Sequence, residues 1–188
     1  MAALHAGQRL GGYTLLAPLH EGGMASLWRV SHPEQAFPLL MKAPHLGYGD
    51  HITKLVGFEV ERMLMPALQG PHVPRFVAAG DEGEQPWLVM EHLAGDTLRS
   101  LLDRAPLPVE RVAQLGALAA TALDALHRQH VAHLDVKPSN LVVQADPATG
   151  EERIVLIDFG LSHHAQLPDL LSEQFHVPLG TAPYIAPE

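Results

Sequence analysis

The first 90 residues alternate between short apolar runs and turn-forming residues, which predicts a small β-sheet. The predicted strands are, in chain order, Tyr13–Leu19, Leu27–Ser31, Phe37–Lys42, Arg75–Ala79 and Trp87–Met90. Between the third and fourth strands, apolar residues recur at helical spacing from Ile52 to Leu68. The pattern therefore predicts a sheet that carries one helix, which Pro66 kinks or ends.

Beyond residue 90 the apolar spacing becomes mainly helical. Asp96 or Thr97 can cap a short helix, and the Ala- and Leu-rich stretch Pro108–Gln129 predicts a long one. Two short apolar runs, Leu141–Val143 and Ile154–Ile157, flank a turn of sequence DPATG and predict a hairpin. The final 28 residues are rich in His, Pro and Gly, and we predict irregular structure there.

Composition excludes several classes of protein. The chain has 188 residues, 47% of them hydrophobic and 18% charged, which excludes a disordered chain. Its net charge of −9 disfavours binding to nucleic acid and to anionic membranes. The absence of Cys excludes disulfides, thiolate catalysis and Cys-based zinc sites. With no long apolar run and no basic segment before an apolar core at the start, we expect a cytoplasmic protein.

A Gly-Gly pair lies between the first two predicted strands, in the segment 19–27. Glycines allow a hairpin to approach phosphates closely, so that backbone N–H groups can act as donors. Taken alone, a Gly-Gly pair in a hairpin is usually just a tight turn.

A second group of polar residues lies in the stretch HLDVKPSN at 133–140. Asp135 and Asn140 are five residues apart in a loop, because Pro138 breaks any helix there. Asp158 follows the predicted hairpin. Two carboxylates, an amide and the adjacent Lys137 can position a hydroxyl nucleophile and hold magnesium against a polyphosphate. The alternative is a turn that happens to carry polar side chains.

Together these segments resemble the protein kinase family, most closely the bacterial eukaryotic-like Ser/Thr kinases. The matching motifs are EGGM at 21–24, LLMK at 39–42, FEVE at 58–61, LVMEHL at 88–93, HLDVKPSN at 133–140, DFG at 158–160, and Gly180-Thr181 with Tyr184 and APE at 186–188. The resemblance implies an α+β, two-lobed protein-kinase fold. Residues 1–93 would form the antiparallel sheet lobe and hinge, and residues 94–188 a partial, mainly helical lobe.

The resemblance also implies ATP and Mg²⁺ as cofactors. The positions matching nucleotide-binding residues of the family are Leu19, His20, Glu21, Gly22, Gly23, Leu27, Leu40, Lys42, Glu61, Met90, Glu91, Leu93 and Val142. Lys42 would contact the α- and β-phosphates, with Glu61 as its ion-pair partner. Backbone groups of Glu91 and Leu93 would bind adenine, with Met90 as the gatekeeper.

Roles in the reaction follow from the same resemblance. Asp135 would accept or orient the proton of the substrate hydroxyl, and Lys137 would stabilise the transferring phosphoryl group. Asn140 would act in catalysis and, with Asp158, would hold Mg²⁺. Thr181 would contact the substrate. Lys137 and Thr181 match the Ser/Thr class, so the expected substrate is a protein Ser or Thr, and the acidic second half of the chain favours basic residues near it.

Several positions depart from the family pattern. His20 and Ala25 replace glycines of the phosphate loop, Leu40 replaces an Ala that faces adenine, and Leu134 replaces the Arg before the catalytic Asp. Without that Arg, no guanidinium at this position can pair with a phosphate on the activation segment. Family domains also continue beyond the APE motif with helices, so we expect a partner or a further segment to cover the second lobe.

Three alternatives stay open at this point. The first is a nucleotide-binding or interaction module without phosphoryl transfer, and the second is a small-molecule kinase of the aminoglycoside or choline type. Lys137, DFG and APE argue against the second. The third is a zinc site at His127, His130 and His133, which lack a carboxylate or Cys to complete the ligand set.

Overall fold

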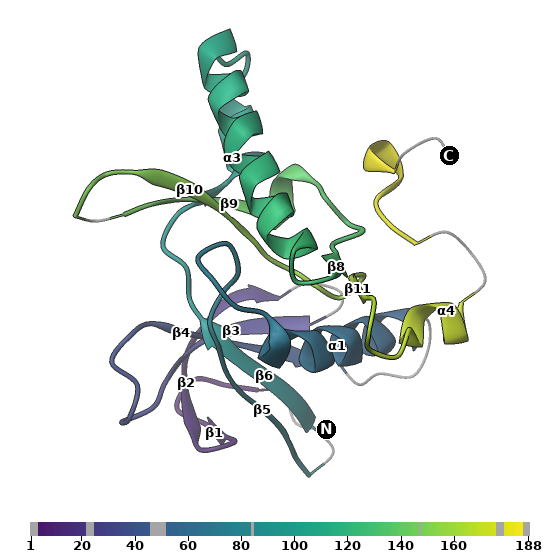
Figure 1. The fold of residues 1–188 in the computed structure, drawn as a ribbon. Coiled ribbons are helices and arrows are strands. Elements are labelled where there is room, and N and C mark those ends of the chain that lie inside the picture. The colour runs from purple at the N-terminus through teal and green to yellow at the C-terminus, as the bar shows by residue number, and fades with distance from the viewer. Residues whose placement is uncertain are drawn as a thin grey trace. The chain divides into compact units, whose positions relative to one another are not determined.

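The protein forms two compact units in a computed structural model, which describes residues 4–21, 25–45, 52–83, 85–146, 148–175 and 179–185. The first unit contains the described residues up to Phe58 together with Arg75–His92. The second contains Glu59–Pro74 and the described residues from Leu93 onward. Figure 1 gives the order of the elements along the chain.

The first unit is built on an antiparallel six-stranded sheet with the strand order β1-β2-β3-β4-β6-β5. Its strands are β1 (Arg9–Leu10), β2 (Tyr13–Glu21), β3 (Ala25–Ser31), β4 (Leu39–Pro44), β5 (Phe76–Glu82) and β6 (Gln85–Glu91). The five predicted strands are confirmed, and β1 is added. The strand predicted from Phe37 begins at Leu39 instead, directly after Pro38, which has no backbone N–H to donate to a ladder.

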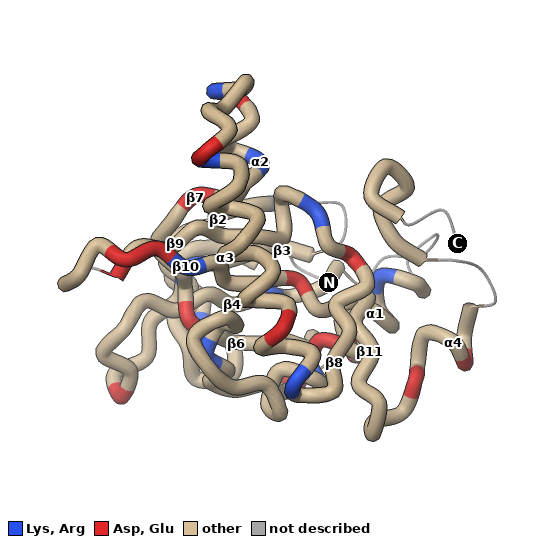
Figure 2. The backbone as a smooth tube through the Cα atoms, turned by 45° about the horizontal axis from the view of Figure 1, so that its top comes forward, with Lys and Arg blue, Asp and Glu red and all other residues tan. Residues whose placement is uncertain are grey.

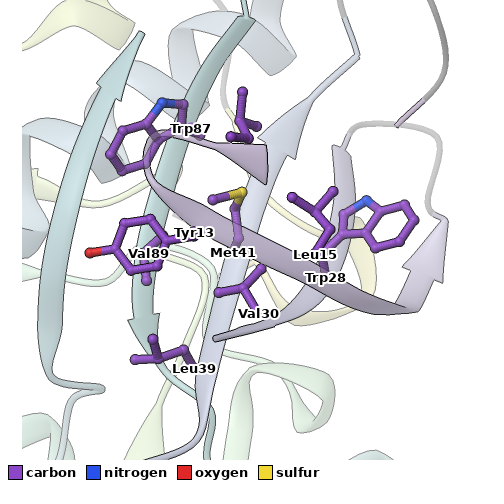
Figure 3. Packing of buried hydrophobic residues seen from close by; sticks show 9 residues of the cluster. Tyr13, Leu15, Trp28, Val30, Leu39, Met41, Trp87 and Val89 are labelled. Carbon is purple, nitrogen blue, oxygen red and sulfur yellow. The ribbon is translucent and has the colours of Figure 1, made fainter. Parts of the chain in front are cut away.

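One face of this sheet buries the core of the unit (Figure 3). Because side chains alternate between faces along a strand, Leu39 and Met41 of β4 share this face with Trp28 and Val30 of β3. All four are at most 3% exposed. Leu27, Leu40 and other residues outside this core therefore lie on the opposite face of the same strands.

The predicted helix over Ile52–Leu68 is observed as α1 (Ile52–Leu64) followed by the 3₁₀ turn η1 (Met65–Ala67). Pro66 lies in the first turn of η1, where a missing N–H costs little. The α-helix therefore ends just before the proline, as predicted.

The second unit contains one long helix, α3 (Val109–His127), and several short elements. Among its described residues beyond Leu93, the other helices are α2 (Leu98–Leu101), η2 (Leu102–Arg104), η3 (Pro138–Asn140), α4 (Leu170–Gln174) and η4 (Ala182–Tyr184). Strands β7 (Asp96–Thr97), β9 (Leu141–Ala145) and β10 (Glu152–Leu156) form one sheet, in the order β10-β9-β7, and β8 (Val131–Ala132) pairs with β11 (His163–His164). Of the two predicted caps, Asp96 and Thr97, the structure uses Thr97, whose Oγ1 accepts from Ser100 N at 3.3 Å.

Residues 59–74 pack with the second unit, whereas the predicted boundary at residue 93 assigns them to the first. Hydrogen bonds to distant parts of the second unit explain this placement. The ring of His72 bonds the carbonyl of Ile154 at 2.8 Å, and Gln69 exchanges two hydrogen bonds with the side chain of Gln129. These contacts join segments 60 or more residues apart, so local sequence patterns do not indicate them.

The final segment is more regular than predicted. It contains β11, α4 and η4, and Asp169 caps α4 by accepting a hydrogen bond from Ser172 N at 3.1 Å. His163 and His164 are half-buried residues of strand β11. No helix among the described residues has the length and hydropathy that crossing a membrane requires.

Candidate active site

The stretch 133–140 forms a loop between β8 and β9, as the position of Pro138 predicts. The turn η3 closes the loop through a hydrogen bond from Asn140 N to the carbonyl of Lys137 at 2.9 Å. Leu134 has a φ of 60°, in the left-handed region that non-glycine residues rarely adopt. This backbone conformation directs consecutive residues apart, so that Leu134 is 57% exposed while Asp135 is 7% exposed.

Asp135 is the centre of a hydrogen-bonded network in the second unit. Its Oδ1 accepts from Thr181 Oγ1 at 2.7 Å, and its Oδ2 accepts from Lys137 Nζ at 2.6 Å. Lys137 Nζ also donates to Thr181 Oγ1 at 2.8 Å. A buried carboxylate is stable when it is paired and hydrogen-bonded in this way. The structure therefore brings together three residues that the sequence places up to 46 positions apart.

Asn140 completes the network from the other side of the loop. Its Nδ2 donates to the Asp135 backbone carbonyl at 2.9 Å and to Asp135 Oδ2 at 3.2 Å. These two bonds orient the amide so that Oδ1 faces away from Asp135. The backbone carbonyl of Asn140 in turn accepts from Ile157 N at 3.0 Å, which connects the loop to the residue before Asp158.

His133 is 2% exposed and acts as a packing residue. Its Nδ1 accepts from Asp135 N at 3.3 Å, so Nε2 carries the proton and donates to the Ile157 carbonyl at 3.1 Å. Its ring also contacts the ring of Phe159. Burial lowers the pKa of His133, because removal from water penalises the charged imidazolium. The neutral ring therefore joins the 133–140 loop to the DFG segment.

The DFG segment is held by several buried contacts within the second unit. Phe159 is fully buried, and its N–H donates to Glu61 Oε1 on α1 at 3.4 Å. Ser162, which is 3% exposed, donates from Oγ to the His133 carbonyl at 3.0 Å. Asp158 has a φ of 65°, so its backbone is held in a conformation that the surrounding contacts must stabilise. Sequence reasoning did not identify this contact of Ser162, which joins the segment after DFG to the 133–140 loop.

The donor set of this segment fits Mg²⁺. A carboxylate from Asp158 and an amide oxygen from Asn140 are hard oxygen ligands, and Mg²⁺ in nucleotide sites commonly uses one or two carboxylates with the phosphates themselves. Asn140 Oδ1 has Ser139 Oγ as a neighbour only at 3.4 Å, which is a weak hydrogen bond. The residues therefore suit the metal that the resemblance implies.

A second group of predicted residues shares one face of the sheet in the first unit. Leu27 of β3 pairs with Lys42 of β4, Leu40 pairs with Met90 of β6, and Lys42 also pairs with Leu88. Directly opposite residues of paired strands have neighbouring side chains on the same face. This face lies opposite the core of Figure 3, and Leu27, Leu40 and Lys42 are each only half-buried. A Lys on a mostly apolar surface can hold an anion next to an apolar ring.

The remaining predicted nucleotide residues are spread over both units. Leu19 and His20 are exposed in β2 and Glu21 ends that strand, while Gly22 and Gly23 lie outside the described residues. Glu91 ends β6 in the first unit. Glu61, Leu93 and Val142 belong to the second unit, where Glu61 and Val142 are buried. The expected pairing of Lys42 with Glu61 joins residues of different units and stays a prediction.

The described residues contain no group of three or more His, Cys, Asp or Glu that could hold a metal ion. His127, His130 and His133 therefore do not form a zinc site. Helix α3 ends at His127, His130 adopts a φ of 61°, and the His133 ring is used in packing, so the three rings do not share a helix face.

Known proteins resemble this chain in sequence. A family model described as a protein kinase domain matches residues 16–188. The serine/threonine-protein kinase pkn2 of Myxococcus xanthus is 32% identical over 180 residues, which cover 95% of this chain and 21% of that relative. The serine/threonine-protein kinase PknF of Mycobacterium tuberculosis is 32% identical over 191 residues, which cover 97% of this chain and 38% of PknF.

Solved structures resemble the chain as well. One crystal structure of the Mycobacterium tuberculosis PknI kinase domain has a TM-score of 0.66 and 27% identity, covering 84% of this chain and 63% of that one. Another has a TM-score of 0.66 and 26% identity, covering 94% and 69%. The chain thus spans about a fifth to two fifths of the length of these curated relatives, and about two thirds of the solved domains.

Proposed function

Because the chain belongs to the protein kinase family, we propose that it transfers the γ-phosphoryl group of ATP to a Ser or Thr hydroxyl of a protein. The predicted α+β protein-kinase fold is confirmed by the solved PknI kinase domains. The chain spans only part of its curated relatives, so the proposed activity rests on its own residues.

The network around Asp135 is the observation that carries the proposal. Thr181 and Lys137 donate to the two carboxylate oxygens of Asp135, and Asn140 donates to Oδ2 as well. Three donors hold the carboxylate in one orientation, which is what positioning a hydroxyl nucleophile requires. A polar turn without a catalytic role requires neither a buried carboxylate nor a hydrogen-bond donor from 46 residues away.

Each residue of the network has a role in the proposed reaction. The Asp135 carboxylate accepts the proton of the acceptor hydroxyl, or orients that hydroxyl towards the phosphoryl group. Lys137 Nζ lies 2.6 Å from Asp135 Oδ2 and places a positive charge where the transferring phosphoryl group carries negative charge. The Thr181 hydroxyl joins the two side chains and fixes the activation segment beside them.

ATP and Mg²⁺ are the cofactors we propose. The sheet face with Leu27, Leu40, Lys42 and Met90 offers apolar contact for adenine, and the Lys42 cation can contact phosphate. Asn140 and Asp158 would hold Mg²⁺, which neutralises charge on the phosphates when it is bound. Since the reaction uses ATP, we propose that it takes place in the cytoplasm, and we propose neither a nucleic acid nor a membrane as a partner.

The first experiment is incubation of the protein with Mg²⁺ and ATP, with and without a generic basic protein, followed by intact mass measurement. We expect phosphate increments on an acceptor that disappear in Asp135→Asn and in Lys42→Met. The first variant removes the carboxylate that receives the proton, and the second removes the phosphate-binding cation.

The outcomes separate the alternatives. Nucleotide binding without any increment would contradict the proposal and indicate a non-catalytic nucleotide-binding module. Increments that persist in Asp135→Asn would exclude Asp135 from the reaction. Transfer to amino alcohols but to no protein would identify a small-molecule kinase instead.

A further inference from the structure

The second unit contains an open pocket of about 360 Å³, which is not part of the Asp135 network. Its apolar wall consists of Ala132, Leu134, Leu161, Leu171, Phe175 and Leu179. Its polar lining consists of His163, Asp169 and Ser172. Pockets of this size with apolar walls and a few polar groups are typical binding sites. Leu134 is 57% exposed, so a large apolar side chain of this wall faces water.

The pocket adjoins the residues that would carry out phosphoryl transfer. Leu134 directly precedes Asp135, and Leu179 lies two residues before Thr181. Thr181 and Asp135 are hydrogen-bonded at 2.7 Å, so two of the chain segments that line the pocket continue into the Asp135 network. A peptide whose hydroxyl reaches Asp135 would therefore have neighbouring side chains within reach of the pocket.

The charge of the pocket selects among possible occupants. None of the nine lining residues is Lys or Arg. Asp169 Oδ1 accepts from Ser172 N, and hydrogen bonds from Ser172 lower the pKa of Asp169, which keeps it a carboxylate. Its Oδ2 lies 3.8 Å from His163 Nε2, beyond hydrogen-bond distance. Figure 2 shows acidic and no basic positions along α4, and Glu173 adds a second carboxylate there.

We propose that this pocket is a docking site for the acceptor protein, which inserts an apolar side chain that has a Lys or Arg as its close neighbour. This inference rests on the proposed function and specifies its substrate class. The apolar side chain contacts the leucines and Phe175, and the cation lies against Asp169. A phosphate or an acidic peptide is a poor occupant, because it would meet Asp169 and the apolar Leu134 without any lysine or arginine of the lining.

The test measures binding of labelled peptides by fluorescence anisotropy at low salt, where exposed charge pairs are least screened. One peptide carries Ser, Leu and Arg, a second has Ala in place of Leu, and a third has Gln in place of Arg. The protein is used as wild type, as Asp169→Asn and as Glu173→Gln. The Asn side chain can still accept from Ser172 N, so α4 keeps its cap. Glu173→Gln is the matched control, because it removes one charge from the same helix outside the pocket.

We expect Asp169→Asn to weaken binding of the Arg peptide about five-fold and to leave the Gln peptide within two-fold. Glu173→Gln should change neither by more than two-fold. Replacing Leu with Ala in the peptide should weaken binding to all three proteins about ten-fold. The proposal would be overturned if Asp169→Asn and Glu173→Gln changed the affinity for the Arg peptide equally. It would also be overturned if Asp169→Asn weakened binding of the Arg peptide and of the Gln peptide equally.

Phosphorylation of the same peptides separates the docking site from the proposed function. Peptides that bind with the expected pattern but receive no phosphate would support the docking site and contradict the kinase activity. Peptides that receive phosphate equally well with and without Leu and Arg would support the kinase activity and contradict the pocket.

Discussion

At the scale of single residues, the proposed phosphoryl transfer depends on which side chains contact Asp135. The residue types around it were predictable, since Lys137 and Asn140 lie in the same loop and match a known motif. Thr181 was predicted only as a substrate contact. The structure gives it a further role, because its hydroxyl donates to Asp135 and accepts from Lys137.

Thr181→Val should lower kcat about ten- to hundred-fold, because Asp135 loses one donor and Lys137 loses an acceptor. The loss of one half-buried hydrogen-bonding group should lower the free energy of unfolding by only about 1–3 kcal/mol. Thr181→Ser is the matched control, since it keeps the hydroxyl and should retain most of kcat. Steady-state kinetics and thermal unfolding check both variants, and an unchanged kcat in Thr181→Val would contradict the role assigned to this hydroxyl.

At the scale of elements, most of the fold was predictable from local patterns. Alternation predicted five strands, a proline located the C-terminal end of α1, and a capping residue located the start of α2. β1 was missed because two residues are too few for a periodic signal. α4 was missed although Asp169 lies three residues before Ser172, which is the spacing of an N-cap. Short elements are stabilised by tertiary packing, and Leu171 of α4 is 7% exposed.

The turn before β2 depends on a close approach between Gly11 and Trp87. A Cβ at Gly11 would lie 2.2 Å from Cζ2 of the Trp87 ring, and φ is +59°. Gly11→Ala should therefore lower the free energy of unfolding of the first unit by more than 1 kcal/mol. Gly7→Ala is the control, because its φ is +85° but nothing lies within 4 Å of its Cβ. Chemical unfolding followed by Trp fluorescence compares the two, and equal losses would show that strain in φ accounts for the whole effect.

At the scale of the whole molecule, stability depends on buried polar groups as well as on the cores of the two units. His133 is the clearest case. Its pKa is lowered by burial, whereas an imidazole in the unfolded chain titrates near its ordinary value of about 6.5. Below that pH the unfolded chain binds a proton that the folded protein does not bind. The free energy of unfolding should therefore fall as pH decreases from about 6.5, by at most about 1.4 kcal/mol per pH unit.

Urea unfolding followed by circular dichroism between pH 5 and 8 tests this expectation. His133→Gln is the comparison, because Gln cannot titrate while the other twelve histidines are unchanged. We expect the stability difference between wild type and His133→Gln to be largest above pH 7 and to shrink towards pH 5. A difference that does not vary with pH would mean that His133 titrates alike in both states.

The sequence by itself determined the family, the order of the main strands and helices, and the residue types of the site. These are local properties, because alternation, capping and motif spacing all act over a few residues. Only the tertiary structure decided that Thr181 joins Asp135 and Lys137, that Glu59–Pro74 packs with the second unit, and that a pocket with Asp169 adjoins the site. The reason is that packing brings together residues far apart in the chain, and no local pattern records which distant partner a buried polar group will find.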